Sequence, residues 1–170
     1  MLVEHPFLLS HKIRLAIRDK RKHDIQKPAC LLQRNRQSQL SSATWQVFFS
    51  PHGGATSAIR EALEKAEESV LAQAYSFTLA PIAEALVRAH RRGVAVRVIL
   101  DRSQRTDEYS VADFLANSGI ITIIDAAHAI AHSNIIIIAN ETVITGSFNF
   151  TKAAEERYAG NISTISSKEL

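Results

Sequence analysis

Short apolar runs alternate from Trp45 onward with segments whose apolar residues recur every three or four positions. Alternation of this kind is typical of an α/β fold, in which strands and helices follow one another. The apolar runs predict strands at 46–49, 69–77, 94–100, 120–124, 134–138 and 142–145. The helical spacing predicts helices in the two intervals that separate the first three strands, and a short one at 111–117.

The connections between these elements predict how the strands pair. Strand, helix and strand over 69–100 predict a parallel β-α-β unit with a right-handed crossover. Asn140 and Glu141 form a turn between two short apolar runs, which predicts an antiparallel hairpin. We therefore expect an α/β fold with a mixed, mainly parallel β-sheet flanked by helices.

Local patterns add three expectations about single elements. Thr56 or Ser57 is expected to cap the first helix. The four consecutive isoleucines at 135–138 predict a strand that is buried on both faces. The aromatic residues of the first strand are expected to belong to the core rather than to a base-stacking platform, namely Trp45, Phe48 and Phe49.

Composition is that of an ordinary globular domain. The chain has 170 residues, of which 46% are hydrophobic and 22% charged, and this length suffices to bury a core. No window approaches eighteen consecutive apolar residues, so no transmembrane segment is expected. The first residues lack the apolar stretch of a signal peptide, which predicts a cytoplasmic location. The single Cys30 cannot form an internal disulfide.

The net charge of +3 hides an uneven distribution. Residues 1–40 contain nine Lys or Arg against three Asp or Glu, whereas the rest contains eleven against fourteen. We therefore expect a basic, flexible N-terminal arm at 1–44 and a folded domain at 45–170. Such an arm could hold phosphates by releasing counterions. A solvated tail without a partner, or a wrongly chosen start codon, would give the same pattern.

One segment carries recognisable chemistry. The sequence His-Ser-Asn-Ile-Ile-Ile-Ile-Ala at 132–139 is followed, after six residues, by Gly-Ser-Phe-Asn at 146–149. This spacing resembles the HKD motif of the phospholipase D superfamily, HxKxxxxD, six residues and GSxN. The resemblance extends to 49–56, 65–78, 91–104 and 145–157, which are similar to the small single-motif Nuc-type endonucleases. It implies the phospholipase D/nuclease fold in its single-motif form.

The resemblance also implies a reaction. In this family a His ring nitrogen attacks a phosphodiester and forms a phosphohistidine, which water then hydrolyses. Position by position, His132 is the nucleophile, Ser147 and Asn149 are phosphate-binding donors, and Gly146 forms the tight turn after the hairpin. No metal or other cofactor is implied. The expected partners are nucleic acid or anionic phospholipid as substrate, and a second copy of the chain in a homodimer.

The sequence departs from the family pattern at three positions. Asn134 stands where the motif has Lys, and Ala139 where it has Asp. Gly160 replaces the Glu that is expected to orient the nucleophilic His. Loss of one preorganised phosphate donor typically costs about 10²–10³-fold in rate, so the sequence predicts an impaired enzyme.

Nearby cations offer one route to compensation. We expect the loop at 101–109 to follow a strand at its carboxyl end, where open α/β sheets bind ligands. Four side chains on loops near this edge could approach the phosphate, or could be solvated surface charges: Arg102, Arg105, His128 and Lys152.

Two functions of different class therefore remain after the sequence is read. The first is a phospholipase D-type phosphodiesterase with reduced activity. The second is a catalytically inactive module that binds nucleic acid or anionic lipid through Ser147, Asn149 and the basic arm. A decayed gene product without present function is a third possibility.

Overall fold

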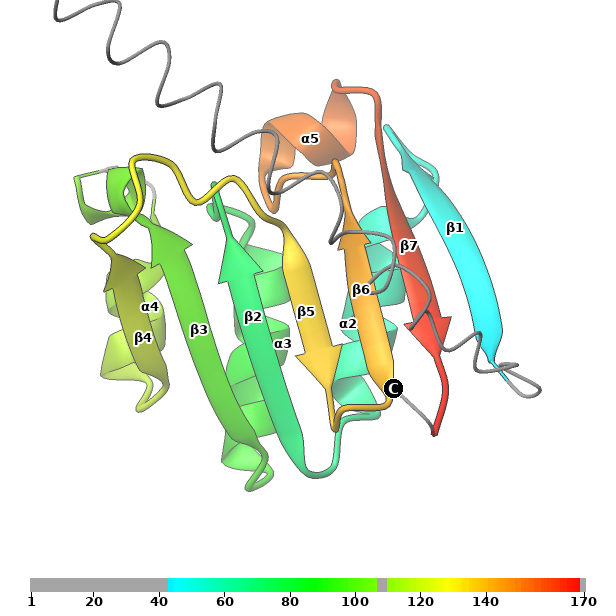
Figure 1. Ribbon diagram of the computed structural model, residues 1–170, viewed down its shortest axis with the longest axis horizontal. Helices are drawn as coiled ribbons and strands as arrows, with labels where there is room; N and C mark the ends of the chain where they lie inside the picture. The colour runs from blue at the N-terminus through cyan, green and yellow to red at the C-terminus, as the bar shows by residue number, and fades with distance from the viewer. Residues whose placement is uncertain (1–42, 107–109, 169–170) are drawn as a thin grey trace, which may run out of the picture. The chain divides into compact units, whose positions relative to one another are not determined.

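The computed structural model describes residues 43–106 and 110–168 (Figure 1). All but the last two residues of the expected basic arm lie outside these ranges. The described strands are β1 (Thr44–Ser50), β2 (Ser69–Ala74), β3 (Ala95–Asp101), β4 (Ile121–Asp125), β5 (Ile135–Ile138), β6 (Thr142–Gly146) and β7 (Gly160–Ser166). The helices are α2 (Ala55–Glu64), α3 (Ala80–Arg91), the 3₁₀ turn η3 (Arg102–Arg105), α4 (Ala112–Asn117) and α5 (Lys152–Glu156).

The seven strands form one mixed sheet in the order β1-β7-β6-β5-β2-β3-β4. The expected α/β fold with flanking helices is confirmed. Only β2 with β3 and β3 with β4 pair in parallel, whereas the other four pairs among the described strands are antiparallel. The expected predominance of parallel pairing is therefore corrected. The parallel pairs are the sheet neighbours joined by helical crossovers, β2 to β3 and β3 to β4, whereas α2 connects β1 to β2, which are not neighbours. Strand β7, which the apolar pattern did not predict, adds two antiparallel pairings.

The predicted hairpin is present between β5 and β6. Ile135 lies opposite Thr145, and Ile138 lies opposite Thr142. The turn contains two consecutive residues with positive φ, Ala139 at 51° and Asn140 at 57°. This left-handed conformation suits Asn but strains Ala, because the Cβ of an L-residue crowds the backbone there.

One face of the sheet packs against helices and forms the core. Figure 1 shows α2, α3 and α4 behind the strands. Their apolar faces bury Ile59, Leu63, Ile82, Leu86 and Leu115 against Val98, Leu100, Ile136, Ile144 and Ile162 of the sheet. None of the helices in the described part is long and apolar enough to cross a membrane.

The start of α2 differs from the sequence-based expectation. The helix begins at Ala55, directly after Gly54 in a left-handed conformation with φ of 84°, and has no side-chain cap. Thr56 and Ser57 therefore lie inside the helix. The Thr56 hydroxyl donates instead to a Glu155 carboxylate oxygen, at 2.5 Å, and so links α2 to α5.

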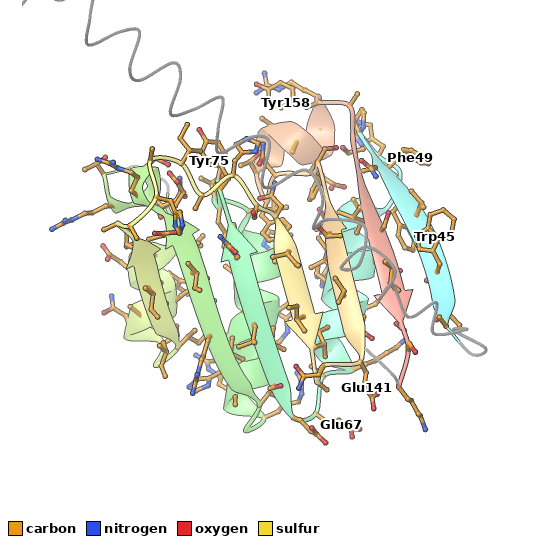
Figure 2. The ribbon with its side chains drawn as sticks, viewed as in Figure 1. Trp45, Phe49, Glu67, Tyr75, Glu141 and Tyr158 are labelled. Atoms are coloured by element: carbon orange, nitrogen blue, oxygen red, sulfur yellow. The ribbon has the colours of Figure 1, made fainter. Side chains whose placement is uncertain are left out.

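The opposite face of the sheet carries no helix among the described residues (Figure 1). Apolar side chains nevertheless point to that side, and we call this surface the open face. Trp45 is 68% and Phe49 63% exposed, and both project from β1 at the sheet edge (Figure 2). Further exposed members on the inner strands and on β4 are Leu71, Ile99, Ile121 and Ile123.

The open face corrects two expectations. Trp45 and Phe49 do not belong to the core, although Phe48 does pack against it from the helix side. The isoleucines of β5 alternate between half-buried and buried instead of being covered on both faces. An apolar sequence run shows that a face avoids water, but it does not show which segment or partner covers that face.

Candidate active site

The two halves of the motif emerge at the same edge of the sheet. Because Ile135 pairs with Thr145 in an antiparallel hairpin, the residues before 135 and those after 145 lie at one end. Strand β2 runs antiparallel to β5, with Gln73 opposite Ile135, so its carboxyl end reaches the same edge. His132, Ser147 and Tyr75 therefore lie at one edge of the sheet, on three different segments.

His132 is exposed and lies on the loop that leads into β5. Its imidazole contacts the ring of Tyr75, with ring centroids 4.3 Å apart and planes tilted by 41°. Tyr75 follows β2 and lies at the upper sheet edge in Figure 2. Within the described residues no carboxylate hydrogen-bonds to the His132 ring, which instead packs against the Tyr75 ring.

Asn134, at the position of the motif Lys, is buried, with 6% of its surface exposed. Its Nδ2 donates to Asn149 Oδ1 at 2.9 Å, and its Oδ1 accepts from the Tyr75 backbone N–H at 3.3 Å. The backbone donor fixes which way the amide points. Asn134 therefore joins Tyr75 to Asn149 and brings no positive charge.

Ser147 and Asn161 form a second polar pair. The Ser147 hydroxyl donates to Asn161 Oδ1 at 2.9 Å and accepts from the Asn161 backbone N–H at 3.2 Å. Ser147 is exposed and Asn161 half-buried. Sequence reasoning did not assign a role to Asn161, because a single Asn at the start of a weakly apolar strand carries no signal.

Two glycines border this pair for steric reasons. Gly146 is the last residue of β6 and pairs with Ile162. A Cβ at this position would lie 2.1 Å from the Asn161 carbonyl oxygen, so Gly146 allows close approach of β7 and does not form the expected tight turn. A Cβ at Gly160 would lie 3.4 Å from Ser147 Oγ. A side chain at 160 would therefore begin beside the predicted phosphate donors.

Ala139 lies away from this site. It follows β5 at the strand's other end, and its N–H donates to the Ser69 carbonyl at 3.0 Å, where β2 begins. Figure 2 shows the nearby Glu141 at the lower edge of the sheet and Tyr75 at the upper edge. Residue 139 therefore lies at the end of β5 opposite to the His132 loop, which argues against the expectation that loss of the motif Asp slows the reaction.

Asp101, at the end of β3, anchors the loop that carries His132. The residue is 2% exposed. Its Oδ2 accepts from the Ala131 N–H at 2.6 Å and its Oδ1 from the Ser103 N–H at 2.9 Å. Burial alone raises the pKa of Asp101, but the hydrogen bonds from Ala131 and Ser103 prevail and lower it below the ordinary 3.8. The buried carboxylate is therefore ionised and fixes the residue before His132.

The four side chains proposed to compensate for the missing Lys have different surroundings. His128 Nδ1 lies 2.8 Å from Asp125 Oδ2, and this hydrogen bond is the main cause of a lowered pKa of Asp125. Lys152 Nζ lies 3.7 Å from Glu156 Oε1. Arg102 and Arg105 are exposed on η3 and line a cavity of about 550 Å³ that Tyr75 also lines. These two arginines therefore line the same cavity as Tyr75, the residue whose ring contacts His132.

Within 43–106 and 110–168, no group of three or more His, Cys, Asp or Glu is arranged to hold a metal ion. The expectation that the reaction needs no metal stays a prediction.

Comparison with known proteins places this geometry in a family. The pattern described as "Cardiolipin synthase, PLD-like domain" matches residues 59–170. The chain is 44% identical over 133 residues to "Phospholipase D" of Rickettsia conorii, a match that covers 78% of this chain and 66% of that protein. It is 31% identical over 123 residues to "Mitochondrial cardiolipin hydrolase" of Danio rerio, covering 71% and 54% respectively. The chain thus spans about two thirds or less of the length of these relatives.

A solved structure has the same architecture. The phospholipase D family member Nuc from Salmonella typhimurium superimposes with a TM-score of 0.70 and 42% sequence identity, over 74% of this chain and 84% of that one.

Proposed function

The chain belongs to the phospholipase D superfamily, and from that membership we propose that it is a phosphodiesterase whose nucleophile is His132. The observation that supports this proposal is the convergence at one sheet edge. An exposed imidazole, held by Tyr75 and by a loop tied to Asp101, lies at the edge where the Ser147 and Asn149 side chains emerge.

The proposed reaction has two steps. A nitrogen of neutral His132 attacks phosphorus, the bond from phosphorus to the leaving oxygen breaks, and the departing alcohol takes up a proton. Water then attacks the phosphohistidine, which releases a phosphomonoester and restores the imidazole. The Ser147 hydroxyl and the Asn149 amide would donate to the non-bridging oxygens, whose charge must be stabilised in both transition states.

We expect this reaction to be slow. Asn134 supplies no cation, and its amide already bonds to Tyr75 and Asn149. Gly160 supplies no carboxylate to orient the imidazole. Two members of one catalytic unit are therefore missing, and their effects on rate need not add.

The burial of Asn134 also favours a second candidate function, a protein that binds phosphodiesters without cleaving them. Its hydrogen bond orients Asn149, whose Nδ2 then points away from Asn134 and can donate to a phosphate oxygen. Binding needs such donors, whereas turnover needs the missing charges as well. Nucleic acid or anionic phospholipid would be the ligand in this case.

Assembly and location remain proposals. We propose a homodimer, since the described residues carry one copy of the motif and the open face presents apolar surface of the kind that subunits bury. A cytoplasmic location is proposed on the sequence alone.

Hydrolysis of bis(p-nitrophenyl) phosphate in the presence of a chelator tests the enzyme proposal. The wild type, His132→Ala and the control Ser133→Ala would be compared, because Ser133 is the exposed neighbour on the same loop. We expect slow turnover that His132→Ala abolishes and Ser133→Ala preserves. Quenching with an alkaline denaturant during turnover should leave a p-nitrophenyl phosphoryl group on His132, which acid then releases because the P–N bond is acid-labile.

Two other results have a clear meaning. Turnover that survives His132→Ala contradicts the proposed nucleophile. A silent wild type that binds oligonucleotide or anionic vesicles with an affinity that falls steeply with salt supports the binding protein instead.

A further inference from the structure

A cavity of about 550 Å³ opens beside the His132 loop, at the carboxyl ends of β3 and β4. One wall is the 3₁₀ turn η3 with Arg102 and Arg105, and the other is the 126–130 segment with the exposed Ile130. Tyr75 lines the cavity and also contacts the His132 ring. The cavity and the candidate active site therefore share a side chain.

The arginine-bearing wall is held by buried polar groups. Asp101 Oδ1 accepts from the Ser103 N–H at 2.9 Å, and Gln104 Oε1 accepts from the Phe77 N–H at 3.0 Å. Gln104 is only 3% exposed. These bonds anchor η3 at Ser103 and Gln104, which lie between its two exposed arginines. A ligand would meet a backbone that is already ordered, which lowers the entropic cost of binding.

The same carboxylate connects this wall to the active-site loop. Asp101 Oδ2 accepts from the Ala131 N–H at 2.6 Å, next to His132 and next to Ile130 of the apolar wall. The buried Asp101 carboxylate therefore holds both the turn that carries the two arginines and the loop that carries the proposed nucleophile. A single ligand could span both without a large rearrangement.

The chemistry of the walls defines what such a ligand must carry. Guanidinium groups bind phosphate oxygens in pairs of parallel hydrogen bonds. Among residues 43–106 and 110–168, no carboxylate forms an ion pair with Arg102 or Arg105. The facing wall offers Ile124, Ala126, Ala129 and Ile130, which suits a base or sugar. A phosphate with a planar apolar group beside it meets both requirements.

We propose that this cavity is a second phosphate subsite, which binds the nucleotide next to the phosphodiester held at His132. The inference rests on the proposed function of the His132 site and extends it to a substrate class, single-stranded nucleic acid. A polynucleotide always carries a neighbouring phosphate, whereas a phospholipid with one diester does not. The few small apolar residues of the wall also offer little length for an acyl chain.

Binding of fluorescein-labelled dT10 to the full chain, with a chelator present, tests the subsite. The variant is Arg102→Gln with Arg105→Gln, and the control is Arg91→Gln, an exposed arginine in the last turn of α3, far from the carboxyl end of β3. We expect the double variant to weaken dT10 binding about tenfold or more and to lower the salt slope by about 1–2. The control should match the wild type.

A ligand with one phosphodiester separates this subsite from general electrostatics. The dinucleotide d(TpT), measured by competition, should lose much less affinity than dT10 in the double variant. An equal loss for both ligands, or no loss for dT10, overturns the subsite. Weakened binding to cardiolipin vesicles with unchanged dT10 binding also overturns it and assigns the arginines to lipid.

The dT10 binding experiment tests the subsite whether or not the protein hydrolyses phosphodiesters. If the wild type fails to hydrolyse bis(p-nitrophenyl) phosphate but the arginine effect on dT10 is present, the enzyme proposal fails and the subsite stands. If turnover is present and the arginine effect is absent, the reverse holds. Unchanged circular dichroism and thermal midpoints would show that the variants are folded.

Discussion

The two ends of β5 have different surroundings, although positions of the same motif stand at both. At the amino end, Asn134 is buried and bonded to Tyr75 and Asn149, next to the loop that presents His132. At the carboxyl end, Ala139 occupies a left-handed turn, and its N–H donates to the backbone carbonyl of Ser69. A four-residue strand separates positions at its two ends by about 13 Å or more, so they cannot contact the same phosphate.

Loss of the motif Lys and loss of the motif Asp look alike in the sequence, but this difference gives them different expected consequences. Replacement of the motif Lys by Asn134 changes the chemistry of the site. Replacement of the motif Asp by Ala139 changes the backbone preference of a turn, because Asp adopts the left-handed conformation more readily than Ala. The first loss should affect rate, and the second should affect stability.

The largest effect is expected from restoring the charges near His132. Asn134→Lys with Gly160→Glu should raise the rate of bis(p-nitrophenyl) phosphate hydrolysis about 10²-fold or more, because a cation and a His-orienting carboxylate return to the site. Ala139→Asp should leave the rate unchanged. Initial rates of the three proteins give the comparison.

The control for that experiment is the fold of the double variant. A Cβ at Gly160 would lie 3.1 Å from Ser50 Oγ, so this hydroxyl must move slightly. A thermal melt would report any loss of stability that this movement causes. A rate that rises with Ala139→Asp alone would contradict the separation of the two ends.

Removal of Asp101, which anchors the loop at the amino end of β5, should have the next largest effect. Asp101→Ala leaves the N–H groups of Ala131 and Ser103 without their buried acceptor, and should destabilise the protein by about 2–4 kcal/mol. Urea denaturation measures this loss. Asp113→Ala, at an exposed position in the first turn of α4, should cost at most about 1 kcal/mol. Equal losses would mean that the buried carboxylate is not an anchor.

The same anchor predicts a pH dependence. The pKa of Asp101 lies below 3.8 in the folded protein, so ionised Asp101 favours folding above that pH. This contribution should disappear as the pH falls from 3.8 through the lower folded pKa. Thermal midpoints measured downward from about pH 5 should fall less steeply in Asp101→Asn than in the wild type. A slope that is unchanged would contradict the lowered pKa.

The smallest effect is expected at the carboxyl end of β5. Ala139→Gly should stabilise the protein by about 0.5–1 kcal/mol, since Gly adopts positive φ without steric cost. The same substitution in a helix should have the opposite sign, so Ala116→Gly at an exposed position in α4 should destabilise by about 0.5–1 kcal/mol. The free energy of unfolding of both variants, measured by chemical denaturation, tests these two expectations. A loss of stability at 139 would show that the turn does not strain Ala.

Local patterns were sufficient to predict much of the fold. The β5-β6 hairpin and the β2-α3-β3 unit follow from adjacent apolar runs and turns. Strand β7 and helix α5 were not predicted, because Gly160–Ser166 contains only two Ile among small and polar residues. Its strand character comes from pairing with β1, more than a hundred residues earlier, and with β6.

The site was predicted only in part for a similar reason. Motif spacing assigned His132, Ser147 and Asn149 to the site, and this assignment stays a prediction. Because spacing counts residues along the chain and gives no direction in space, it also included Ala139. Tyr75 and Asp101 act through contacts across the sheet, with the His132 ring and the Ala131 N–H. Neither contact has a sequence signature.

The open face has a consequence for how this protein's stability is defined. Any segment or partner that covers the open face would stabilise the folded protein, because it would bury apolar side chains that are now exposed. These include Trp45, Phe49, Ile121 and Ile123. If a second copy supplies the cover, mass action makes the melting temperature rise with protein concentration; a cover from the same chain leaves it constant. Dilution thus distinguishes an intramolecular cover from an intermolecular one.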